Sequence, residues 1–60
     1  PEMIYATVYN NLNVVVLQQN QQGNTGNNVV TLQVNNLIAG QYNIRLVYGN
    51  RVCYARFQKL

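Results

Sequence analysis

The chain has 60 residues, a net charge of +3 and a single cysteine, so it can form at most one small domain with no internal disulfide. It contains no His, Ser, Asp or Trp, and its only carboxylate side chain is Glu2. Catalysis needs a base beside the reacting group and a metal site needs several ligands, so the composition argues against an enzyme, a metal and any other cofactor.

The first third of the chain predicts two strands joined by a turn. "IYATVYN" (4–10) alternates with period two, and "VVVLQQ" (14–19) is a β-branched run that suits a strand better than a helix. Between them, Asn10 and Asn13 mark a turn, because Asn tolerates the left-handed backbone conformation better than any residue except Gly.

The middle third predicts a loop, a strand and a second turn. Residues 20–28 are polar with two glycines and predict a mobile loop. "VVTLQV" (29–34) resumes the alternation, with Leu32 on its inner face, and a turn then closes at Gly40.

The last third predicts a tight hairpin. "QYNIRLVY" (41–48) alternates most clearly of all, and Gly49 with Asn50 forms a two-residue turn. In the final strand (51–59), Cys53 alternates with Ala55 and Phe57, and all three are expected to face the core. Cys53 is therefore expected to be a buried structural residue rather than a reactive thiol.

Five strands with short connections and no helix predict an all-β fold, a small antiparallel Ig-like β-sandwich. Because such sandwiches have about seven strands, we expect this chain to lack one or two N-terminal strands and to expose an edge or groove there. The expected core residues are Val8, Leu32, Tyr42, Ile44, Leu46 and Phe57. The expected structural turn residues are Asn10, Asn13, Gly40 and Gly49.

The basic residues all lie in the last third of the chain: Arg45, Arg51, Arg56 and Lys59. Four are few for nucleic acid, because DNA-binding proteins commonly neutralise about 6–10 phosphates. No apolar run is long enough for a membrane-spanning helix. We therefore expect neither nucleic-acid binding nor a membrane span.

Motifs in the second half follow a fixed order: a turn Asn-Leu-x-x-Gly, a strand x-Tyr-x-x-Arg-Leu, a Gly-containing hairpin turn, and a terminal strand with basic and apolar residues. The matching residues are Asn36, Leu37, Ala39 and Gly40, then Tyr42, Arg45 and Leu46, then Gly49, and finally Phe57 and Lys59. Upstream, Val8, Tyr9, Asn10 and Val16 match Val-Tyr-Asn-x-x-Gly-x-x-Val, with Asn13 in place of Gly. In these motifs the chain resembles the C-terminal sorting domain of proteins exported by the type IX secretion system of Bacteroidetes. The first strand of that family, with its Tyr-Pro-Asn-Pro-like signature, is absent.

The resemblance implies a non-enzymatic secretion signal, in which residues 1–60 are the end of a longer precursor. Its partners would be an outer-membrane shuttle protein, the translocon and a sortase, and its cargo would be secreted or placed on the cell surface. The residues expected to contact a partner are Arg45, Arg56, Lys59 and Leu60.

Two other hypotheses stay open beside the sorting signal. One is an Ig-like accessory or adhesion module whose Tyr5, Tyr9 and Tyr54 stack on sugars. The other is a structural subunit that assembles by strand addition. A small single-strand nucleic-acid binder is a distant further alternative, because four basic residues make a poor backbone groove.

Overall fold

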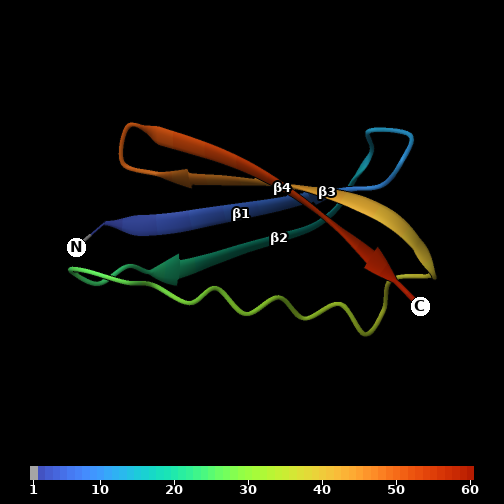
Figure 1. Ribbon diagram of the computed structural model, residues 1–60, viewed down its shortest axis with the longest axis horizontal. Coiled ribbons are helices and arrows are strands. Elements are labelled where there is room, and N and C mark those ends of the chain that lie inside the picture. The colour runs from blue at the N-terminus through green and yellow to red at the C-terminus, as the bar shows by residue number, and fades with distance from the viewer. Residues whose placement is uncertain (1) are drawn as a thin grey trace.

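The computed structural model describes residues 2–60 as one twisted β-sheet (Figure 1). Its strands are β1 (Met3–Tyr9), β2 (Val15–Gln22), β3 (Gly40–Tyr48) and β4 (Arg51–Lys59). The sheet order is β2-β1-β3-β4, and every neighbouring pair is antiparallel. The predicted all-β antiparallel fold is therefore confirmed. None of residues 2–60 forms a helix of the length and apolarity that crossing a bilayer requires.

The turns at Asn10, Asn13 and Gly49 form where they were expected. Gly40, also expected as a turn residue, is instead the first residue of β3 and pairs with Lys59, because the second turn ends before it. The Asn10 Oδ1 accepts hydrogen bonds from the backbone N–H of Leu12 at 2.9 Å and of Val14 at 3.0 Å. Asn13 has a φ of 63°, which is the left-handed conformation predicted for it. Gly49 has a φ of 61° in the β3–β4 hairpin. Local side-chain hydrogen bonds and backbone preferences thus account for both hairpins.

The middle of the chain differs from its prediction in two ways. β2 continues to Gln22, so 20–22 belong to a strand, and Asn20 pairs with Tyr5. Conversely, residues 29–34 pair with no strand, so the described part of the chain has four strands rather than five. The strand prediction for 29–34 was wrong because its backbone bonds to glutamine side chains, and through Val34 to the following turn, but not to another strand.

Two glutamine side chains of β2 hold the extended segment 29–34. The Gln19 Nε2 donates to the Thr31 carbonyl oxygen at 2.7 Å, and its Oε1 accepts from the Gln33 N–H at 2.8 Å. The Gln21 Nε2 donates to the Val29 carbonyl oxygen at 2.6 Å. Within residues 2–60, this segment alone covers one face of the sheet. The described residues therefore form one sheet and not the two that were expected for a sandwich.

The core is small and lies under the extended segment. The buried hydrophobic residues are Ile4, Ala6, Val8 and Tyr42, and Val8 is fully buried. The Tyr42 ring stacks on Phe57 with centroids 5.2 Å apart, and its hydroxyl donates to the Ile38 carbonyl oxygen. Of the six predicted core residues, the other four are half-buried: Leu32, Ile44, Leu46 and Phe57.

Cys53 and Ala55 are exposed, which corrects the prediction that they face a core. Their side chains do point to the apolar face, because Cys53 lies opposite Leu46 and Ala55 lies opposite Ile44. β4 is an edge strand, however, and no second layer covers it among the described residues. The predicted alternation of β4 was correct. Burial of its inner residues would also require a second layer of structure, which residues 2–60 do not place over β4.

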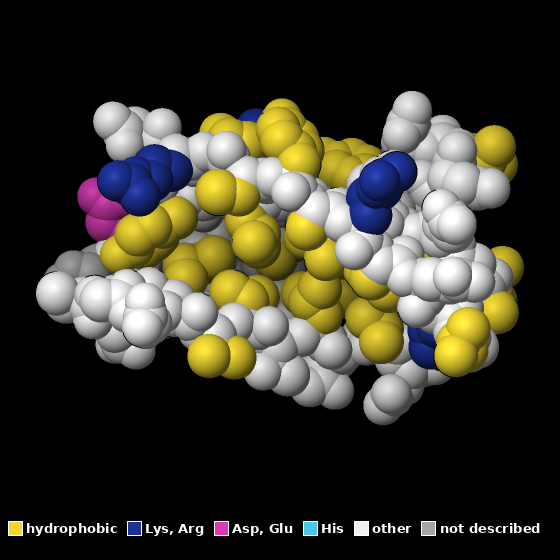
Figure 2. Space-filling model, viewed as in Figure 1, with side chains coloured by type: hydrophobic (Ala, Val, Ile, Leu, Met, Phe, Trp, Pro, Cys, Tyr) yellow, Lys and Arg dark blue, Asp and Glu magenta, His cyan; other side chains and the backbone are white. Residues whose placement is uncertain are grey.

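The extended segment and β4 converge at one end of the molecule and separate towards the other (Figure 1). They meet where the Lys59 Nζ donates to the Leu37 carbonyl oxygen at 2.7 Å. Between them, hydrophobic side chains gather in a long hollow (Figure 2). The sheet thus has one partly covered apolar face and one open face.

Candidate recognition surfaces

The open face carries a group of aromatic, amide and guanidinium side chains, which we call the tyrosine–arginine surface. Strand register builds it in two rows across β1, β3 and β4. One row consists of Tyr9, Asn43 and Arg56. The neighbouring row consists of Thr7, Arg45 and Tyr54. Directly opposed residues in antiparallel strands point to the same face, so these side chains form one continuous surface.

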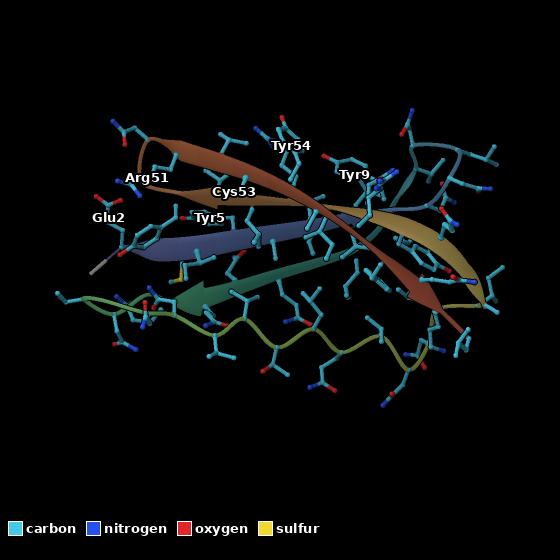
Figure 3. All side chains as sticks on the ribbon, viewed as in Figure 1. Glu2, Tyr5, Tyr9, Arg51, Cys53 and Tyr54 are labelled. Atoms are coloured by element: carbon cyan, nitrogen blue, oxygen red, sulfur yellow. The ribbon has the colours of Figure 1, made fainter. Side chains whose placement is uncertain are left out.

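A shallow hollow of about 390 Å³ lies in this surface, lined in part by Tyr9, Asn43, Arg45 and Tyr54. A neighbouring hollow of about 300 Å³ shares Asn43 and Tyr54 and adds Arg56. Tyr54 is 76% exposed and projects from β4 away from the extended segment (Figure 3). Phenol rings offer stacking faces, while the amide and guanidinium groups offer several hydrogen-bond donors.

This surface has no carboxylate side chain to neutralise its arginines. The sequence has one such group, Glu2, and it lies with Arg51 at the hairpin-turn end of the molecule (Figure 3). The Glu2 carboxylate lies against Gly49. Glu2 precedes the first residue of β1, whereas Tyr9 is the last, so the two lie at opposite ends of this strand. Arg45 and Arg56 are therefore able to bind an anionic or strongly polar partner, for which guanidinium provides paired donors.

A second candidate surface lies at the opposite end of the molecule, between the two Asn-rich turns. We call it the end cleft; its volume is about 580 Å³. Its lining residues are Asn10, Asn11, Leu12, Val16, Asn36, Leu37, Ile38, Ala39, Gly40, Gln41 and Tyr42. Leu12 is 77% exposed and Ile38 is 81% exposed, so two large apolar side chains stand in solvent there.

The C-terminus is attached to the end cleft. The hydrogen bond from Lys59 to the Leu37 carbonyl oxygen fixes the end of β4 against the second turn. Leu60 follows directly and is 99% exposed. Leu60 thus follows a residue that is bonded to the end cleft, whose lining mixes exposed apolar side chains with Asn and Gln.

The structure divides the four predicted recognition residues between these two surfaces. Arg45 and Arg56 lie on the tyrosine–arginine surface, whereas Lys59 and Leu60 lie at the end cleft. Lys59 is half-buried, and its ammonium group donates to the Leu37 carbonyl oxygen, so it stabilises the turn that precedes β3. Sequence reasoning did not single out Leu12, Asn43 or Ile38. The placement of Leu and Ile inside turns rich in Asn would have indicated exposed apolar side chains.

No cluster of His, Cys, Asp or Glu that could hold a metal ion occurs within residues 2–60. Comparison with protein-family profiles, with curated proteins and with solved structures finds no match. The two surfaces therefore have to be interpreted from their own chemistry, together with the motif resemblance.

Proposed function

We propose that this chain is a non-enzymatic C-terminal sorting signal that directs an attached cargo through the type IX outer-membrane translocon by binding a shuttle protein. A cargo carried in this way would reach the cell surface or the medium, and a sortase is a further partner. Recognition takes place at the end cleft and the C-terminal residue.

One observation carries this proposal: residues of the motif resemblance that are far apart in the sequence meet at the end cleft. The residues concerned are Asn10, Val16, Asn36, Leu37, Ala39, Gly40 and Tyr42. Lys59, from the last motif, is hydrogen-bonded to Leu37 in the same place. A sorting signal that a partner protein recognises requires an accessible surface of this kind and does not require catalytic residues.

The proposal is tested by export of a fluorescent reporter fused upstream of residues 1–60 in a type IX-competent host. Deletion of Lys59 and Leu60 would also remove the hydrogen bond to Leu37, so the two residues are changed separately. Leu60→Glu should lower export at least tenfold without changing stability, because a side chain that is 99% exposed contributes no packing. Lys59→Met should lower both export and the thermal midpoint.

The matched control is Val29→Glu, which places the same charge on another apolar residue that is 80% exposed and away from the end cleft. Its export should equal that of the unchanged chain. Normal export of Leu60→Glu, or an equal loss in Val29→Glu, would contradict a recognition site at the end cleft. Periplasmic retention of the unchanged fusion, with the reporter folded, would contradict the sorting function itself.

The tyrosine–arginine surface favours a second candidate function, an adhesion module that binds acidic glycans. Exposed Tyr54 and half-buried Tyr9 offer stacking faces for sugar rings, and Arg45 offers donors for a uronate carboxylate. Glycan-array binding that is lost in Tyr54→Ala, with export unchanged, would support this candidate.

A further inference from the structure

The apolar hollow between the extended segment and β4 is the most incomplete part of the molecule. At its narrow end it is a groove of about 270 Å³, lined by Val30, Leu32, Val34, Ile44 and Phe57. All five side chains are half-buried, and exposed Cys53 and Ala55 continue the same face along β4. Figure 2 shows hydrophobic side chains along the length of this hollow. A domain of this size would normally cover such a surface.

One wall of the groove has free backbone groups. In an extended segment, the N–H and C=O groups of alternate residues point to opposite edges. The Val29 and Thr31 carbonyls and the Gln33 N–H bond to glutamine side chains of β2. The N–H and C=O groups of Val30 and Leu32, on the other edge, have no hydrogen-bond partner among residues 2–60. A β-strand beside them could form the missing bonds.

The other wall is β4, an edge strand that pairs only with β3. Two of its basic residues, Arg51 and Lys59, alternate with Cys53, Ala55 and Phe57 and therefore share the groove face, whereas Arg56 points to the open face. β4 has no carboxylate side chain. A second copy of this chain would place like charges against this wall, because each copy carries +3. Charge complementarity therefore favours a strand with acidic residues over self-association.

We infer that the groove binds an extended acidic segment of a partner protein by strand addition. The bound segment forms main-chain hydrogen bonds with Val30 and Leu32. It places apolar side chains at alternate positions between Leu32 and Phe57, and carboxylates near Arg51 and Lys59 at the two ends of β4. This inference does not rest on the proposed sorting function, because it concerns a different surface.

The test uses the 60-residue chain and a fluorescein-labelled octapeptide of alternating valine and glutamate. Binding is measured by fluorescence anisotropy in reducing buffer. The same peptide with lysine in place of glutamate should bind at least tenfold more weakly. Two further peptides carry N-methyl groups on the valines or on the glutamates, and at least one of them should also lose tenfold, because N-methylation removes the N–H groups along one edge of the strand.

Hydrogen exchange locates the bound peptide. The amides of Val30 and Leu32 should gain at least tenfold protection, and alkylation of Cys53 by iodoacetamide should slow, since Cys53 lies on the groove side of β4. Val30→Pro removes a free N–H without breaking an intramolecular hydrogen bond among the described residues, and should weaken binding tenfold. Val30→Ala keeps the N–H and should bind more tightly than Val30→Pro.

Several outcomes would overturn the inference. They are absence of binding, undiminished binding of the lysine peptide, undiminished binding of both N-methylated peptides, or protection confined to β4. Sedimentation is measured in parallel without peptide. A dimer in which Val30 and Leu32 are already protected would assign the groove to a second copy instead. Preserved protection of the Gln33 amide shows that Val30→Pro leaves the segment in place, because that N–H donates to Gln19.

Discussion

At the scale of single residues, side chains with local hydrogen bonds or unusual backbone conformations determine the two hairpins. Asn10 and Asn13 act together in the β1–β2 turn, one by accepting two backbone hydrogen bonds and the other by a φ of 63°. Asn reaches this conformation at lower cost than other residues with a side chain, because its short polar group can bond locally. This is why the turn forms although Asn13 stands where the related motif has Gly.

Asn13→Ala tests this explanation. Alanine in the left-handed conformation costs roughly 1–2 kcal/mol, so the free energy of unfolding should fall by about 1 kcal/mol in a urea titration. Asn13→Gly should change it by less than about 0.5 kcal/mol, since Gly adopts this φ without strain. Asn11→Ala, in the same turn, is the control and should have little effect. Equal losses for Ala at 11 and 13 would show that backbone strain at Asn13 is unimportant.

At the scale of elements, the glutamine side chains of β2 are the feature that most changes the fold. They provide both a donor and an acceptor, as a peptide group does, so they replace the neighbouring strand that 29–34 would otherwise need. The segment is thereby held over the core, and it leaves one edge free. Of the eighteen amide side chains in the sequence, those of Gln19 and Gln21 thus have a clear structural use.

Gln19→Ala should release this segment. The variant loses two hydrogen bonds, and because the site is partly exposed we expect a loss of about 1 kcal/mol in the free energy of unfolding. The amide of Gln33 should lose its protection from hydrogen exchange. Gln18→Ala, one residue away on the opposite face of β2, should leave that protection unchanged. Protection that survives in Gln19→Ala would mean that packing of Leu32 alone holds the segment.

At the scale of the whole molecule, charge and incomplete layering act together. Only four hydrophobic side chains are buried among residues 2–60, and β4 offers a regular edge of nine residues. Such an edge invites pairing between copies, and its basic residues oppose it. Three of the four basic residues lie on β4, so copies that approach along this edge bring like charges together.

Raising the salt concentration should therefore promote self-association. The screening length falls from about 30 Å at 0.01 M salt to about 3 Å at 1 M, so repulsion between two β4 strands is lost. Sedimentation velocity in reducing buffer should show monomer at low salt and dimer or larger species at high salt. Arg56→Gln should shift this transition to lower salt. A chain that stays monomeric at 1 M salt would show that something other than charge protects the edge.

The sequence by itself determined which stretches alternate and where the chain turns. The strands around Val8 and Ile44 and the turns at Asn13 and Gly49 were predicted correctly, because period-two alternation and φ preferences are local properties. Tyr42, Ile44 and Leu46, which were predicted as core residues of 41–48, also share a face in β3, since alternate residues of a strand always point to the same side.

Only the tertiary structure decided which apolar faces are covered and which distant residues meet. Cys53 alternates as a core residue would but is exposed, because burial depends on a second layer that lies elsewhere in the chain or is missing. The extended segment 29–34 has the pattern of a strand, yet its partners are two glutamine side chains. The separation of Arg56 from Lys59 onto opposite faces follows from their odd spacing, but the attachment of Lys59 to Leu37 depends on a contact across 22 residues. Such contacts arise from packing, which one-dimensional alternation does not specify.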